Sequence, residues 1–208
     1  MKKVYRAVAI VCVVAFSIST LVTGCAKKVM SPEQVVKTYF SELKAGETTK
    51  AADLVIAMDS GTSGDSSSSS TAESESMYKA MFSKIDAKTE GKAKISGHTA
   101  SIKVKITAPD MKKIMTNEVS KMFSAALANA FSSSSMSSED TDSQMTADVT
   151  KELSQPDVAL ASTEMDVQLK RQNGQWKIES TKNFEDAVTG GLYSFSEGLG
   201  SDTSSSSK

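Results

Sequence analysis

Residues 164–179 read EMDVQLKRQNGQWKIE, and this stretch decides the fold class. Apolar and polar residues alternate on both sides of the pair Asn173-Gly174. The apolar positions are Met165, Val167, Leu169, Trp176 and Ile178. An alternation of period two indicates strands with one buried face. Asn-Gly is the preferred two-residue turn between antiparallel strands, because both of its positions need a positive φ. We therefore expect a β-hairpin here.

A second hairpin is expected upstream of the first. Ala93 and Ile95 lead to Gly97-His98, which is a turn signal. Beyond this turn, apolar residues alternate with serine, lysine and threonine, as in a strand that leaves one face in water. The apolar positions of that strand are Ala100, Ile102, Val104, Ile106 and Ala108. Pro109-Asp110 ends it.

The clearest helix start is Ser31-Pro32-Glu33-Gln34. Serine can cap the helix, proline fits the first helical position, and glutamine three residues after the serine completes a capping box. The apolar residues that follow at helical spacing are Val35, Val36, Tyr39, Phe40 and Leu43. Gly46 is the expected left-handed residue that ends the helix.

Further helices are expected before, between and after the two hairpins. The first two cover residues 48–58 and a segment that carries Met77, Tyr78, Met81, Phe82 and Ile85. A long amphipathic helix is expected over 110–131, a shorter one over 144–153, and a last helical turn or two within 184–192. The stripe of the long helix is Met111, Met115, Val119, Met122, Ala126 and Ala130, widened by Ile114, Phe123 and Leu127.

These elements predict an α+β fold, because antiparallel strands are segregated from helices. We expect N-terminal helices packed on a curved antiparallel sheet in one domain over 31–192, with a helical, serine-rich insertion at 110–155 between the two hairpins. Serine-rich stretches offer too little apolar surface to offset the entropy of ordering. We therefore expect disorder in the loop 59–72, in residues 132–142 and in a tail over 193–208.

The N-terminus has the parts of a secretory signal. Lys2, Lys3 and Arg6 precede an uncharged, mostly apolar run from Ala7 to Val22. This run of 16 residues is short for a spanning helix, which needs roughly 20. From the run alone, an uncleaved anchor or a simple secreted protein remains open.

Leu21-Val22-Thr23-Gly24-Cys25 resembles the lipobox of bacterial lipoproteins. The resemblance implies that residues 1–24 are removed as a signal peptide and that the Cys25 thiol receives diacylglycerol. Residues 25–30 would then be a lipidated linker. Two acyl chains hold a protein on a bilayer stably, whereas one chain holds it only marginally. The expected location is therefore the extracytoplasmic face of the cell membrane.

Composition excludes several kinds of site. The whole chain has 24 basic and 25 acidic residues, and removing the three cations of the leader leaves 21 against 25, a net charge of −4. This balance argues against nucleic acid as a partner. His98 is the single histidine, and Cys12 lies in the predicted leader. We therefore expect no metal site, no cofactor and no catalytic residue.

Two segments resemble one known superfamily. Residues 31–46 are similar to the first helix of small exported lipoproteins in the nuclear-transport-factor-two-like superfamily, and residues 173–178 are similar to its last hairpin. The resemblance implies a cone, in which helices close the concave face of a bent sheet and leave a pocket at the open end. The insertion departs from the minimal pattern and would cap the mouth of the cone or dock outside it.

Three functions follow from these expectations. The leading one is a non-catalytic module that binds a small apolar ligand or another envelope protein. The residues suggested for such a pocket or surface are Tyr39, Met115, Met122, Phe123 and Trp176, with ordinary core packing as the alternative for each. A structural or assembly subunit is the second, and it predicts a filled cone and an exposed apolar face on the 110–131 helix. An acid–base enzyme of the same superfamily, using carboxylates or Tyr78, is the third.

Overall fold

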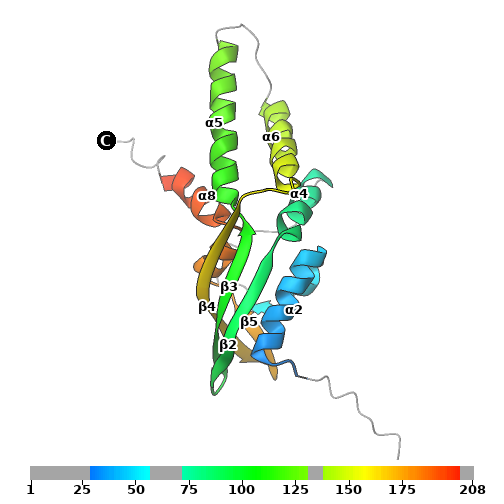
Figure 1. Cartoon of the computed structure of the whole chain (residues 1–208), viewed down its shortest axis with the longest axis vertical. Coiled ribbons are helices and arrows are strands. Elements are labelled where there is room, and N and C mark those ends of the chain that lie inside the picture. Colours follow the sequence, from blue (N-terminus) through cyan, green and yellow to red (C-terminus); the bar gives the residue numbers. More distant parts are fainter. Residues whose placement is uncertain (1–28, 57–71, 131–137, 202–208) are drawn as a thin grey trace, which may run out of the picture.

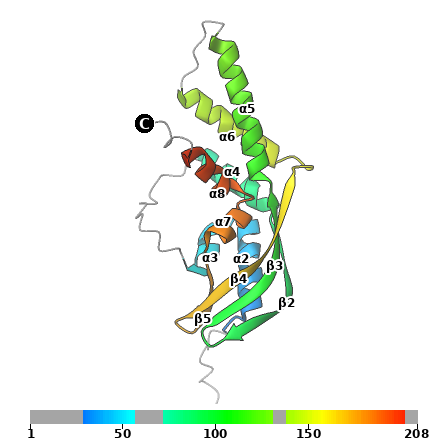
Figure 2. The ribbon, with the colours of Figure 1, turned by 90° about the vertical axis from the view of Figure 1, so that its left-hand side faces the viewer.

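The computed structural model describes residues 29–56, 72–130 and 138–201 (Figure 1). Its sheet has the strand order β1-β5-β4-β3-β2, antiparallel throughout except that β1 runs parallel to β5. The strands are β1 Val55–Ile56, β2 Asp86–Ser96, β3 Thr99–Pro109, β4 Leu160–Gln172 and β5 Gln175–Glu179. Helices pack on one face of this curved sheet (Figure 2), so the predicted α+β class is confirmed.

Both predicted hairpins are present. Asn173 and Gly174 connect β4 to β5 with φ values of 52° and 79°, as the Asn-Gly turn requires. The β2–β3 turn contains Gly97 at φ 58° and His98. β3 and β4 pair without interruption from Thr99↔Lys170 to Pro109↔Leu160, and this continuous ladder makes them the centre of the sheet.

Helix α2, Pro32–Ala45, has the start and the end that its sequence predicts. The Ser31 hydroxyl accepts the backbone N–H of Gln34, and the Gln34 side chain accepts the backbone N–H of Ser31 at 3.0 Å. Gly46 ends the helix at φ 80°. The Glu33 carboxylate also accepts the backbone N–H of Ala93 at 2.8 Å, and this bond lowers the pKa of Glu33. It ties the start of α2 to β2.

Apolar side chains cover most of the concave face of the sheet. Helix α2 and helix α7, Lys182–Val188, lie against it (Figure 2). Their buried residues and the inward residues of the strands form one apolar cluster. It contains Val35, Val36, Tyr39, Phe40, Leu43, Ala51, Ile85, Ala100, Ile102, Val104, Ile106, Ala108, Val167, Leu169, Trp176, Ile178, Phe184, Ala187 and Val188.

A second apolar cluster lies at one end of the sheet. There α4 Ala72–Ser83, α5 Met111–Ala130, α6 Ser138–Leu153 and α8 Leu192–Ser201 gather beyond the end of β3 (Figure 1). The buried members of this cluster are Met81, Met111, Ile114, Val149 and Leu153. The insertion therefore docks on α4 and α8 at this end of the sheet.

The helix predicted over 48–58 is wrong in its second half. Helix α3 spans only Thr48–Ala52, and the chain then forms β1. The Leu54 carbonyl accepts the N–H of Ile178 at 2.8 Å, and the Ile56 carbonyl accepts the N–H of Ser180 at 3.1 Å. The edge of β5 thus offers backbone partners that local helical spacing cannot reveal. Residues 57 and 58 lie outside the described part.

Two of the expected disordered segments are partly helical. Helix α6 begins at Ser138, inside the serine-rich stretch 132–142, and α8 begins where a tail was predicted from residue 193. Tertiary partners explain α8: the Asp186 carboxylate accepts the N–H of Ser194 at 2.7 Å, and Lys182 pairs with Glu197 at 2.7 Å. The serine-rich residues 59–71, the leader 1–24 and the tail beyond 201 lie outside the described residues, whereas Ala72 begins α4.

A close backbone contact joins α7 and α8 to the root of α5. Gly190 has φ 60°, and a Cβ atom there would lie 1.8 Å from the Pro109 carbonyl oxygen. The Gly190 carbonyl accepts the N–H of Lys112 at 3.2 Å. Only glycine allows both the left-handed φ and this approach without a large cost.

We expect Gly190→Ala to lower the free energy of unfolding by at least about 3 kcal/mol, because left-handed strain adds to a backbone clash. Gly174→Ala is the matched control, since Gly174 has φ 79° and no atom lies within 4 Å of a Cβ there. Its cost should be about 1 to 2 kcal/mol from the left-handed conformation alone. Urea denaturation measures both values, and equal losses would contradict the close-contact argument.

Candidate functional site

A row of exposed apolar side chains runs along the far half of α5. Phe123 is 71% exposed, Leu127 53% and Val119 39%, and Ala126 between them is also exposed. We call these four residues the α5 stripe. Single exposed apolar residues are ordinary, but a contiguous row of them is a candidate contact surface.

The α5 stripe faces away from the body because of helix geometry. Successive residues turn by about 100°, so Phe123 lies about half a turn round the helix from Ile114, nine residues earlier. Ile114 and Met111 are buried in the second apolar cluster, and this fixes the inward face. The far half of α5 also extends beyond α6 (Figures 1 and 2). No neighbouring helix of the described chain therefore covers the stripe.

The α5 stripe lies far from the start of the domain. Helix α2 begins beside the β2–β3 turn, whereas α5 rises from the opposite end of the sheet (Figure 1). β3 has 11 residues and is about 36 Å long, and α5 has 20 residues and is about 30 Å long. The two elements follow each other along the length of the molecule (Figure 1). The stripe and the start of α2 are thus at opposite ends of the described chain.

The structure does not bring together the five residues suggested from sequence. Tyr39 and Trp176 are buried in the first apolar cluster, where the Tyr39 ring lies edge-on to Phe40 at 5.1 Å. Burial raises the pKa of the Tyr39 hydroxyl, and the charge of Glu185 adds to the effect. Met115 packs half-buried against the second cluster. Met122 is half-buried on the far half of α5, next to the exposed Phe123.

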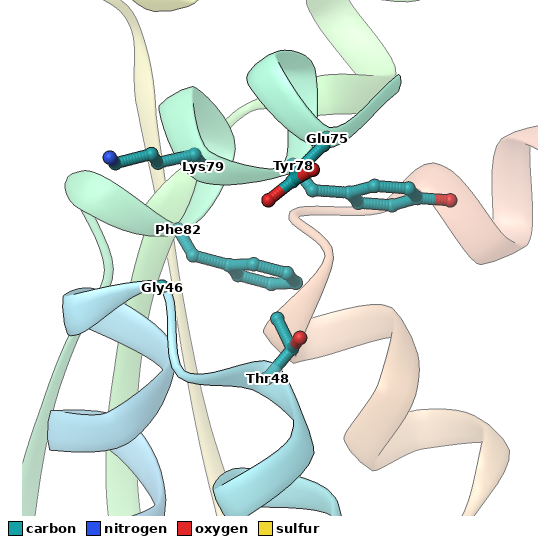
Figure 3. Close-up of a pocket in the computed structure, with 6 residues that line it drawn as sticks. All are labelled: Gly46, Thr48, Glu75, Tyr78, Lys79 and Phe82. Atoms are coloured by element: carbon teal, nitrogen blue, oxygen red, sulfur yellow. The ribbon is translucent and has the colours of Figure 1, made fainter. Parts of the chain in front are cut away.

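A groove separates α4 from the α2–α3 junction (Figure 3). Its volume is about 520 Å³. The rings of Tyr78 and Phe82 stack along it with centroids 6.5 Å apart and an interplanar angle of 12°, and Tyr78 is 47% exposed. The remaining lining residues are Gly46, Thr48, Glu75 and Lys79. This hollow lies between helices, away from the concave face where the superfamily resemblance implied a pocket.

Sequence reasoning missed one buried charge, Glu118. It is 2% exposed and pairs with Lys121 one turn later, and this hydrogen bond raises the pKa of Lys121. A groove of about 590 Å³ between α5 and α6 lies beside the pair and is also lined by Asp148 and Glu152. Glu118 lies four residues after Ile114, and residues at this spacing share one face of a helix. The sequence could therefore have placed Glu118 on the inward face.

Other chemistry has little support among the residues that the structure describes. No three histidine, cysteine, aspartate or glutamate side chains gather closely enough there to hold a metal ion. His98 is exposed in the β2–β3 turn. None of the described helices combines the length and apolarity that crossing a bilayer requires.

Comparisons with known proteins leave the family open. Neither a protein-family profile nor a curated protein matches the sequence. The crystal structure of a candidate lipoprotein, ycdA of Bacillus subtilis, aligns over 76% of this chain and 46% of its own, at 14% identity and a TM-score of 0.39. This chain thus spans less than half of that structure, and so loose an overlap assigns neither fold family nor function.

We expect the α5 stripe to add little to the stability of the isolated domain. Phe123→Ser should change the free energy of unfolding by no more than about 0.5 kcal/mol, because the side chain is exposed. Ile114→Ala, on the inward face of the same helix, should cost about 3 kcal/mol through the cavity it leaves. Thermal or urea denaturation measures both. A loss at Phe123 as large as that at Ile114 would place Phe123 in the core and remove the stripe as a surface.

Proposed function

We propose that this chain is a lipid-anchored, non-catalytic interaction module on the outer face of a membrane, and that the α5 stripe is its contact surface. One observation carries the proposal. Exposed apolar residues recur at helical spacing on a helix that projects from the end of the molecule opposite the start of α2.

Energetics favour a partner for the stripe. Burying apolar surface stabilises by about 25 cal/mol for each Å² removed from water. Phe123 and Leu127 leave more than half of their accessible surface in water. Serines at positions 120 and 124 of the same helix border the apolar row on one side. A partner that covers this face gains that free energy.

A protein partner fits this surface better than a small ligand. Small-molecule sites are concave and enclose most of the ligand surface. The stripe is the convex side of a helix, and the concave face of the sheet is occupied by α2 and α7 side chains. A filled concave face with an exposed apolar face on α5 is also what the assembly-subunit hypothesis predicts. Among the described residues, the Tyr78–Phe82 groove and a hollow of about 370 Å³ between β4 and α7 are two of the places left for a small ligand.

The non-catalytic part of the proposal rests on where the ionisable groups lie. A general acid or base must reach its substrate and have a pKa near the working pH. Burial shifts the pKa of Tyr39 further from neutrality, and Glu118 is paired with Lys121. His98 is exposed in a turn without a carboxylate partner among the described residues.

The anchor has a direct test. In cells that express the full chain with a C-terminal tag, we expect a clickable palmitate analogue to label the wild type and not Cys25→Ser. Cys12→Ser, in the predicted leader, is the matched control and should be labelled normally. Wild-type protein should also partition into detergent. An unlabelled wild type, or label on Cys25→Ser, would reject anchoring at Cys25.

The contact surface is tested by photo-cross-linking in intact cells. A benzoylphenylalanine at position 123 should give defined protein adducts, because that side chain lies against the partner. The same group at position 105, an exposed lysine on the outer face of β3, should give none. Equal adduct patterns at the two positions, or none at either, would reject the stripe as the contact surface.

A further inference from the structure

We infer that the partner of the α5 stripe is a second copy of this chain in the same membrane, with the two α5 helices packed in parallel. The inference rests on the proposed function, because the shared membrane sets the orientation of the two copies. It adds the identity of the partner and the geometry of the contact.

The spacing of the stripe suits a helix of its own kind. Val119, Phe123 and Ala126 are separated by four and then three residues, which is the spacing of the a and d positions in a two-helix coiled coil. Phe123 occupies an a position, and Val119 and Ala126 occupy d positions. Leu127 flanks the seam and widens it. Two copies of α5 can therefore bury these residues against each other.

Charge along the far half of α5 is compatible with self-pairing. Lys121 is the single charged residue from Val119 to Ala128. It lies on the side away from the seam and is paired with Glu118. The positions that flank the seam, Ser120, Met122 and Leu127, are uncharged. Two copies thus meet without like charges, and the neutral seam offers nothing to a strongly charged partner.

The predicted tether selects the parallel orientation. Seven residue steps lead from Cys25 to Pro32, and a fully extended chain of that length reaches about 25 Å. This is much shorter than the combined length of β3 and α5, so the far half of α5 stands away from the anchored end. Two copies in one membrane keep the same orientation and present parallel α5 helices. An antiparallel pair would need anchors in two facing membranes.

The size of the surface makes membrane tethering essential. The stripe spans eight residue steps from Val119 to Leu127, about 12 Å along the helix. Its four side chains are few beside the 20 to 30 residues that each partner contributes to a stable interface, by rough count. Contact between free copies is therefore weak. Attachment to one surface raises the effective concentration toward about millimolar, where a weak contact forms.

Disulfide trapping on intact cells tests the pairing. In the full chain we expect Val119→Cys and Phe123→Cys each to form a covalent dimer on mild oxidation, because each residue meets its own counterpart across the seam. Ser124→Cys, exposed on the same helix but off the seam, is the matched control and should remain monomeric. Adding Phe123→Asp to Val119→Cys should abolish the dimer. Dimer formation by Ser124→Cys to the same extent would overturn the inference.

Co-expression tests the orientation. Val119→Cys and Leu127→Cys with different tags should give no mixed disulfide, because in a parallel pair these positions are about 12 Å apart along the axis. A disulfide needs Cα atoms within about 7 Å. A mixed disulfide without the Val119→Cys homodimer would overturn the parallel arrangement and indicate antiparallel pairing.

The outcomes separate this inference from the proposed function. The absence of every seam disulfide, with position-123 photo-adducts to a different protein, would overturn self-pairing and leave the interaction module standing. The absence of both disulfides and photo-adducts would overturn both. The wild type should form no disulfide-linked dimer, because its Cys25 should carry lipid. A wild-type dimer would show that Cys25 has a free thiol, and the anchor on which the parallel geometry depends would then be absent. Unchanged thermal unfolding of Phe123→Asp confirms that its effect is on pairing.

Discussion

The apolar concave face of the sheet must be shielded from water, and the positions of the helices depend on this requirement. Helices α2 and α7 press their buried side chains against the strands, with Phe40 and Phe184 meeting edge-to-face at a centroid distance of 6.3 Å. This packing has to hold the domain together without an internal disulfide, because Cys25 is the one cysteine outside the predicted leader. It also occupies the space where the sequence resemblance of residues 31–46 and 173–178 implied a pocket, whereas the α5 stripe lies on the outside of the domain.

Local chemistry was enough to predict the parts of the fold whose signals are local. The capping box at Ser31, the left-handed Gly46 and the Asn173-Gly174 turn each satisfy backbone groups within a few residues, so their outcome does not depend on distant contacts. The alternation along β3 and β4 likewise predicted which side chains are buried. Within the described residues, the predicted tail contains α8 because Asp186 accepts a backbone N–H of that helix.

The sequence was less informative about the candidate site, because the exposure of a side chain depends on which other helices and strands pack against it. Phe123 and Ile114 belong to the same broad apolar pattern that the sequence predicts for the long helix. Only the docking of α4, α6 and α8 separates the inward face from the outward one. Trp176 and Tyr39 were ambiguous for the same reason, since an aromatic residue in a strand or a helix suits a core as well as a pocket. The two-residue strand β1 depends wholly on the free edge of β5, a long-range effect.

Helix α5 is packed along its first half and solvated along its second, and this division has a thermodynamic consequence. Nucleating an isolated helix is costly, whereas extending an existing one adds a hydrogen bond for each residue fixed. The packed turns around Met111 and Ile114 therefore act as a template, and the alanine-rich turns beyond them only propagate. The far half of α5 is thus already helical before a partner binds, and binding to it costs little backbone entropy.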